Sequence, residues 1–167
     1  GLGIKSNNDP VFKIHVTKRP ETHKQEKLIQ IIARDFTEED LKYWNSYHIT
    51  IEELDRKGVF SVDKLYINKN LFPGDKMRFA YSFDDYIKIY TPLNREYKWI
   101  SSCPNDYMSG LDEIRYKISQ GMQSKKLIIS KSVKDEIILS KFFKDVCSTQ
   151  NESTTAINQS NMSCILF

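Results

Sequence analysis

Two lysines stand where the pattern of the chain would expose them on a sheet. Lys88 alternates with two isoleucines, and Lys98 alternates with Tyr97 and Trp99, so in extended segments each lysine points away from apolar neighbours. We therefore expect Lys88 and Lys98 to share one exposed face, where ammonium groups can contact phosphates. The alternative is that both are ordinary solvent-facing lysines.

Aromatic residues fall mostly between Phe36 and Trp99, inside patterned segments. Near the two lysines, Tyr90 and Trp99 could stack on nucleic-acid bases. Aromatic residues of a sheet are more often core, and this alternative stays open.

The charge of the chain is mildly basic, with 25 Lys and Arg against 22 Asp and Glu, a net charge of +3. This balance alone does not indicate nucleic-acid binding, but the basic residues are unevenly distributed along the chain. Basic residues cluster at the start (Lys13, His15, Lys18, Arg19, His23, Lys24, Lys27) and in the last third (Lys117, Lys125, Lys126, Lys131, Lys134). These clusters either face phosphates or form a solvated surface.

Length and composition indicate a globular protein. With 167 residues, 40% of them hydrophobic, the chain suffices for one domain or two small lobes. No uncharged apolar stretch approaches the roughly 20 residues of a membrane span, and no leader is seen, so we expect a cytoplasmic protein. Cys103, Cys147 and Cys164 lack zinc-site or disulfide spacing and are expected to be structural thiols.

Helix signals dominate the first third of the chain. After an irregular lead-in we expect a strand over Val11–Val16 and a helix over Glu21–Arg34. Thr37 predicts the cap of one short helix, and Thr50 with Glu53 predicts a capping box for a second, ended by Gly58. The pair is expected to be a packing unit with a structural His48, although a DNA-reading helix-turn-helix is an alternative.

The periodicity changes to two after Gly58. Strands are expected over Val59–Val62, Leu65–Ile67, Met77–Phe83, Tyr86–Tyr90 and Tyr97–Ile100, which together predict a curled antiparallel sheet. A stretch of turns with a short helix near Leu111–Ile118 then separates this sheet from a last segment with a different periodicity.

The last segment alternates strands and helices. Strands are expected over Lys126–Ser130, Val146–Ser148 and Met162–Phe167, with one helix over Val133–Phe143 capped by Ser132 and another after Ser153. Such alternation predicts a mainly parallel sheet. The chain is thus expected to have an α+β fold, divided into residues 1–35 (lead-in and first helix), 36–121 (mixed curled sheet with small helices) and 122–167 (parallel α/β segment).

Three stretches of the sequence carry a family resemblance. Residues 98–104, KWISSCP, followed by Gly110-Leu111, are similar to the segment of bacterial primases in which a lysine, an aromatic residue and a Ser-Pro element precede the Toprim domain. Leu127-Ile128-Ile129 with Lys131 and Asp135 resembles the first Toprim strand and helix. The stretch from Lys88 to Pro92 and on to Lys98-Trp99 resembles the two-lysine segment of phage primases.

The chain therefore resembles, from about Phe36 onward, a fragment of a bacterial or phage-type DNA primase. The resemblance implies the amino-terminal subdomain of the RNA-polymerase core over 36–121 and a truncated Toprim-like sheet over 122–167. Such primases synthesise RNA primers on single-stranded DNA during replication, with Mg²⁺ or Mn²⁺. The resemblance makes Lys88 and Lys98 catalytic and nucleic-acid-binding residues, and Trp99 and Lys131 further nucleic-acid-binding residues.

The resemblance also implies partners and a location. The expected partners are single-stranded DNA template and ribonucleoside triphosphates, with a replicative helicase as a further candidate and no membrane. The location would be the bacterial host cytoplasm if a phage encodes the protein.

The sequence departs from the Toprim pattern at the metal site. A Toprim domain has a glutamate after its first strand and two aspartates after its third, whereas here Lys131 occupies the first position and the sequence ends at Phe167. We therefore expect metal only in the parent protein, and no primer synthesis by this chain alone. Asp135 and Glu152 are candidate metal-site neighbours. Glu136 and Glu152 are nearby acids that could stand in for the missing glutamate, and Asp135 could equally cap a helix.

Two other functions are compatible with the same residues. One is a degenerate Toprim-like nucleic-acid-binding module without catalysis, in which Lys131 contacts phosphate instead of metal. The other is a piece of a Toprim nuclease or topoisomerase, which is disfavoured because those proteins do not place such a sheet and Lys-Trp segment before the Toprim fold. The zinc-binding module with which primases begin has no counterpart in this sequence.

Overall fold

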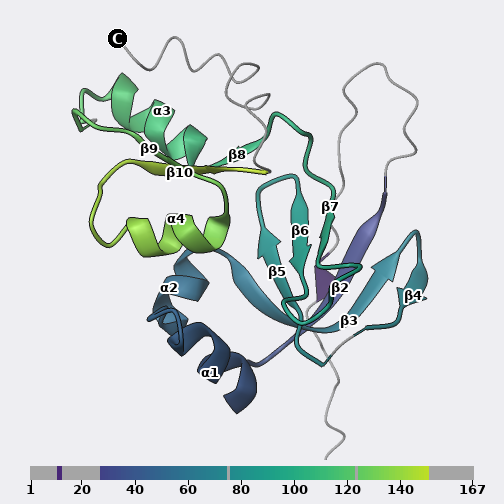
Figure 1. The fold of residues 1–167 in the computed structure, drawn as a ribbon. Coiled ribbons are helices and arrows are strands. Elements are labelled where there is room, and N and C mark those ends of the chain that lie inside the picture. Colours follow the sequence, from purple (N-terminus) through teal and green to yellow (C-terminus); the bar gives the residue numbers. More distant parts are fainter. Residues whose placement is uncertain (1–10, 13–26, 75, 123, 151–167) are drawn as a thin grey trace, which may run out of the picture. The chain divides into compact units, whose positions relative to one another are not determined.

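The computed structural model describes residues 11–12, 27–74, 76–122 and 124–150 (Figure 1). It contains a large antiparallel sheet and a small mixed sheet with four helices in the described ranges, which confirms the α+β class. The chain divides into two compact units, Gly1–Leu41 with Gly58–Ser102, and Lys42–Lys57 with Cys103–Phe167.

The first unit is built on the antiparallel sheet. Its strands follow the order β1-β2-β3-β5-β6-β7, and β4 also pairs with β3. The bounds are β1 (Val11–Phe12), β2 (Ile29–Arg34), β3 (Val59–Ile67), β4 (Asn70–Phe72), β5 (Phe79–Ser82), β6 (Ile87–Tyr90) and β7 (Trp99–Ser101). The predicted antiparallel sheet is confirmed, although the two strands expected before Asn68 form the single strand β3.

One face of this sheet forms a hydrophobic core. Period-two alternation brings together aliphatic side chains of β2, β3, β5 and β6, namely Ile29, Ile31, Val62, Leu65, Ala80, Ile87 and Ile89. Ile67, Phe72 and Ile100 pack against them. Burial of this aliphatic face stabilises the sheet.

The predicted helix over Glu21–Arg34 is wrong in its described part, because Ile29–Arg34 is strand β2. The β-branched Ile29 and Ile31 lie across from Ile67 and Leu65 of β3, so pairing with β3 buries them on one face. Residues 21–26 of that prediction lie outside the described residues. So do residues 13–16 of the predicted first strand, of which Val11–Phe12 is observed as β1.

Helices α1 (Glu38–Asn45) and α2 (Ile51–Arg56) begin where the sequence predicts. Thr50 and Glu53 form the expected capping box, and Gly58 follows α2 at φ 60°, a left-handed conformation that favours glycine. His48 is exposed at φ 59° in the intervening turn, so the expectation of a buried structural histidine is wrong.

The second unit contains the small mixed sheet, in the order β8-β10-β9. Its elements are β8 (Met108–Ser109), α3 (Leu111–Ser119), β9 (Ile128–Ser130), α4 (Val133–Leu139) and β10 (Val146–Thr149). β9 and β10 are parallel, which confirms the strand-helix-strand prediction, whereas the antiparallel β8 is not predicted. The strand expected over Met162–Phe167 and the helix expected after Ser153 lie outside the described residues.

The chain has no helix within its described ranges that combines the length and apolar character needed to span a bilayer.

A buried carboxylate fixes the start of α1 over the sheet of the first unit. Asp40 is 1% exposed, and its Oδ2 accepts hydrogen bonds from Ser61 Oγ at 2.8 Å and from the backbone N–H of Thr37 at 3.0 Å. Arg34 donates to the same oxygen at 3.3 Å and to Ser61 Oγ at 3.0 Å. Asp40 therefore closes the helix cap and joins it to β2 and β3.

Replacement Asp40→Ala is expected to lower the free energy of unfolding by at least about 2 kcal/mol, because it removes a helix-capping partner and leaves the buried Ser61 hydroxyl without its acceptor. Urea unfolding followed by circular dichroism measures the change. The matched control is Glu39→Ala, an exposed acid of the same helix turn, with an expected change within about 0.5 kcal/mol. Equal effects of the two substitutions would contradict the anchoring role of Asp40.

Candidate nucleic-acid interface

The second face of the antiparallel sheet is aromatic. Strand register aligns Ser61, Phe79, Tyr90 and Trp99 across β3, β5, β6 and β7 in one row. The next row on the same face consists of Val59, Tyr81, Lys88 and Ser101. Side chains of one row lie close enough to touch, so the register brings the rings of Phe79, Tyr81, Tyr90 and Trp99 into contact on one face of the sheet.

Ring contacts run along this aromatic face. Tyr90 and Trp99 stack with centroids 4.3 Å apart and planes inclined by 16°. Tyr81 stacks on Tyr90 at 6.4 Å, and Phe79 lies 6.4 Å from Tyr90. Tyr81 and Phe79 are fully buried, whereas Trp99 is 41% exposed, so the series of rings ends in an accessible indole.

Lys88 is buried, which corrects the expectation of an exposed lysine. Its side chain is 6% exposed, and Nζ lies 4.8 Å from the centroid of the Trp99 ring. All four residues of β6 are buried, so this strand is covered on both faces and alternation does not expose Lys88. Lys88 therefore supports Trp99 from the interior and is not a surface phosphate ligand in this structure.

Lys98 is exposed, but it does not share a face with Lys88. Its carbonyl accepts a hydrogen bond from Thr91 N at 2.9 Å, which places it opposite Thr91 in the register. Thr91 alternates with Tyr90, and Lys98 alternates with Trp99. A common exposed face for Lys88 and Lys98 would require Trp99 to lie on the opposite face, with the isoleucines. The register instead pairs Trp99 with Tyr90, so the common lysine face is wrong.

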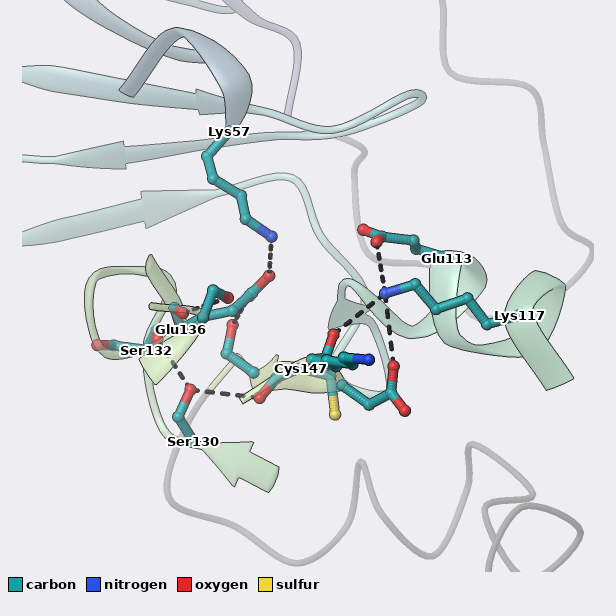
Figure 2. Close-up of polar contacts among 11 residues, drawn as sticks. Lys57, Glu113, Lys117, Ser130, Ser132, Glu136 and Cys147 are labelled. Atoms are coloured by element: carbon teal, nitrogen blue, oxygen red, sulfur yellow. Dashed lines mark hydrogen bonds and ion pairs between the residues drawn. The ribbon is translucent and has the colours of Figure 1, made fainter. Parts of the chain in front are cut away.

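In the second unit, Lys131 is exposed in the turn between β9 and α4. The neighbouring serines fix this turn, since Ser130 Oγ donates to the carbonyls of Ser132 and Cys147 at 3.1 and 3.2 Å (Figure 2). Ser132 caps α4 as predicted, and its hydroxyl lies 2.8 Å from Asp135 Oδ2. Asp135 is thus engaged as the capping acid that the sequence allowed.

Glu136 is the buried centre of this unit. Its side chain is fully buried, Lys57 Nζ donates to Oε1 at 2.7 Å, and Ser148 Oγ donates to Oε2 at 2.7 Å (Figure 2). Gly110 lies so close, at φ 78°, that a Cβ there would come within 2.9 Å of Oε1. The carboxylate thereby joins α4, β10 and the residue after α2.

A signal for this role is present in the sequence, although the interpretation missed it. Glu136 falls at the i+3 position after Val133 and just before Ile137, on the apolar side of α4. An acid on such a stripe is buried with a partner. The suggestion that Glu136 could replace a metal ligand therefore does not fit its surroundings.

The donor set at the β9–α4 turn does not fit a divalent cation. Lys131 brings positive charge, Asp135 is engaged with Ser132, and Glu136 is bound by Lys57 and Ser148. Glu152, the other candidate neighbour, lies outside the described residues. Within residues 27–74, 76–122 and 124–150, no group of three or more His, Cys, Asp or Glu is placed to hold a metal.

A second polar cluster ties α3 to the strand β10. Lys117 Nζ lies 2.8 Å from Glu113 Oε1 and 3.4 Å from Asp145 Oδ1 (Figure 2). The hydrogen bond with Glu113 raises the pKa of Lys117. Burial by itself would raise the pKa of Asp145, but Ser124 and Lys117 hold it below its ordinary value.

The thiol of Cys147 is fully buried. Burial, with a smaller contribution from the Glu136 carboxylate, raises the pKa of Cys147 to about 12. A thiol with so high a pKa stays protonated near neutrality, so Cys147 is a structural residue, as the sequence predicts.

Comparisons of the chain with protein-family models, with curated proteins and with solved structures gave no match.

Replacement Glu136→Ala is expected to lower the free energy of unfolding by about 3 kcal/mol or more, because it leaves Lys57 and the buried Ser148 hydroxyl without their acceptor. Thermal and urea unfolding measure the effect. Glu113→Ala, which removes an exposed acid from an ion pair of the same unit, should cost no more than about 1 kcal/mol. A Glu136→Ala variant as stable as the parent would show that the contacts of Glu136 with Lys57 and Ser148 do not stabilise the fold.

Replacement Asp145→Asn is expected to reduce the free energy of unfolding at neutral pH by about 1.5–3 kcal/mol, the range for hydrogen bonds to charged groups. The pKa of Asp145 is lowered in the folded state, so its contribution is present above the ordinary value of 3.8 and is lost as pH falls through the lower folded-state pKa. Unfolding of parent and variant should therefore converge in acid. Asp112→Asn, at an exposed position, is the control, and a difference that persists unchanged in acid would contradict this assignment.

Proposed function

We propose that the chain carries the template-binding part of a DNA primase of the bacterial and phage type, and that the β6–β7 edge of its sheet binds single-stranded DNA. The observation that carries the proposal is Trp99, an exposed indole stacked on Tyr90 and adjacent to the exposed Lys98. An exposed aromatic ring and an exposed cation at one sheet edge are groups with which proteins bind single strands, by base stacking and phosphate attraction.

The interior supports this platform. Tyr90 holds one side of the Trp99 ring, and Lys88 Nζ approaches the same ring at 4.8 Å. An indole fixed in this way loses little conformational entropy when a base stacks on it. Lys88 thus contributes to binding through Trp99, rather than through phosphate as the resemblance implied.

The order of the elements also supports the primase proposal. The antiparallel sheet with Lys98-Trp99 is followed by the parallel unit β9–α4–β10, the order in which the resemblance places the polymerase subdomain and a Toprim-like sheet. Template DNA and ribonucleoside triphosphates are the corresponding partners. The Mg²⁺ or Mn²⁺ of such a polymerase has no fitting ligands at the described β9–α4 turn, so no catalytic step follows from these residues.

The exposed Lys131 favours a second candidate, a Toprim-like nucleic-acid-binding module without catalysis. A lysine in the position of a metal-binding glutamate reverses the local charge, which suits phosphate rather than a cation. Binding of a labelled oligo-dT by the Lys98→Ala and Lys131→Ala variants separates the candidates. A loss of affinity confined to Lys98→Ala supports the template-binding part of a primase, and a loss confined to Lys131→Ala supports the module.

Replacement Lys98→Ala is expected to weaken binding of a fluorescein-labelled oligo-dT by about five-fold, the equivalent of about 1 kcal/mol for a contact with phosphate. Fluorescence anisotropy of the full chain measures the affinity. The parent affinity should fall with salt, with a slope near 0.7 per phosphate neutralised. Lys69→Ala, in the turn between β3 and β4, is the matched control and should leave binding unchanged. Salt-independent binding, or equal affinities for both variants and the parent, would contradict the interface.

A further inference from the structure

A pocket lies between α2 and α4 of the second unit. It has a volume of about 340 Å³, part of which is open to solvent. The residues that line it belong to the last turns of the two helices or directly follow them, namely Glu53, Arg56, Lys57, Ile137, Ser140 and Lys141. All of them belong to the same compact unit, so this unit forms the pocket by itself.

The charge of this pocket is positive. Its lining carries three cations, Arg56, Lys57 and Lys141, against one carboxylate, Glu53, a formal charge of +2. The buried Glu136 is not part of the lining but pairs with Lys57, and one positive charge remains when this acid is counted. Ile137 adds an apolar wall. Positive charge beside low-dielectric walls attracts anions more strongly than the same charge on an open surface.

The two acids hold the lysines without using all of their donors. Lys57 Nζ donates to Glu136 at 2.7 Å (Figure 2). Lys141 Nζ lies 3.1 Å from Glu53 Oε2 and also donates to the carbonyl of His48. An ammonium group has three N–H donors, so with these partners each lysine keeps at least one for a further acceptor. Both ammonium groups are thus positioned before a ligand binds, which lowers the entropic cost of binding.

Arg56 is the cation that this unit does not neutralise. It is exposed, and no residue in the described part of the chain forms a hydrogen bond or a salt bridge with its guanidinium. A guanidinium presents several N–H donors in a plane, in a geometry that matches the oxygens of phosphate. The pocket therefore combines one uncommitted guanidinium with two positioned ammonium groups.

We propose that this pocket binds a phosphate group in its dianionic form, such as inorganic phosphate or the terminal phosphate of a nucleotide. Arg56 binds the phosphate through its guanidinium, and Lys57 and Lys141 donate their remaining N–H groups to it. A dianion matches the charge of the lining better than the monoanionic phosphodiester of a DNA strand does. This site lies in the second unit, so it does not depend on the proposed binding of single-stranded DNA at the β6–β7 edge of the first.

Titration of the full chain with inorganic phosphate, followed by heteronuclear NMR, tests the assignment, because the amide signals of residues 53–57 and 137–141 report on the pocket. Arg56→Gln should weaken phosphate binding by at least about ten-fold, since it removes a charged donor. It removes no printed contact of the fold. Lys125→Gln, which neutralises an exposed lysine of the same unit outside the pocket, is the control with no expected effect.

Glu53→Gln distinguishes a binding role from a structural one. Glutamine can keep the capping box with Thr50, because its side-chain oxygen accepts the same backbone N–H, but it removes the negative charge of the pocket. Phosphate should therefore bind about two- to five-fold more tightly. Parent-like binding by Arg56→Gln, or no gain with Glu53→Gln, would overturn the assignment, because the cations would then serve only the ends of the helices.

ATP and adenosine, titrated in the same way without metal, identify the source of the phosphate. Binding of ATP more tightly than inorganic phosphate supports a nucleotide, and equal binding supports a site for the phosphate group alone. Adenosine that binds as tightly as ATP would overturn the proposal, as would the absence of amide shifts with both phosphate ligands. Lys98→Ala should leave phosphate binding unchanged, so a failure of single-strand binding and a failure of this site are distinguishable.

Discussion

The burial of charged carboxylates is the constraint on which both units of this protein depend. A carboxylate removed from water destabilises the fold unless donors meet its oxygens. Asp40 obtains its donors from Thr37, Arg34 and Ser61, which ties the first turn of α1 to β2 and β3. Glu136 obtains its donors from Lys57 and Ser148. In each unit, elements distant in the sequence are therefore held in the one arrangement that satisfies the acid.

The need to pair buried acids also distinguishes charged side chains that hold the fold together from those that are exposed to solvent. Glu136 and Asp135 both lie near the β9–α4 turn, yet both are engaged within the protein, whereas Lys131 of the same turn is exposed. In the antiparallel sheet the division falls between two lysines, because Lys88 is the interior charge beneath Trp99 whereas Lys98 faces solvent. Residue type alone did not distinguish the buried from the exposed charges, whereas their burial in the folded units does.

Much of the local structure could be predicted from the sequence, because it depends on neighbours in the chain. Capping by Thr50 and Ser132, and the turn at Gly58, are local hydrogen-bonding and steric effects that the residue types reveal. Pairing between distant strands was harder to predict from the sequence. The helix expected over Glu21–Arg34 is wrong over Ile29–Arg34, because pairing with β3 overrides a helical spacing. The face of Lys98 was misassigned because it depends on which residue of β6 lies opposite Trp99.

The strand register that buries Lys88 also fixes the aromatic rings at the exposed edge of the sheet. Tyr90 lies directly across from Trp99, so the indole rests on a ring that is itself buried and cannot move away. Rigid aromatic surfaces lower the entropic cost of binding, and they do so whatever the base sequence, because every base presents a π-face. In the proposed function, such an edge would bind single strands without discriminating among base sequences.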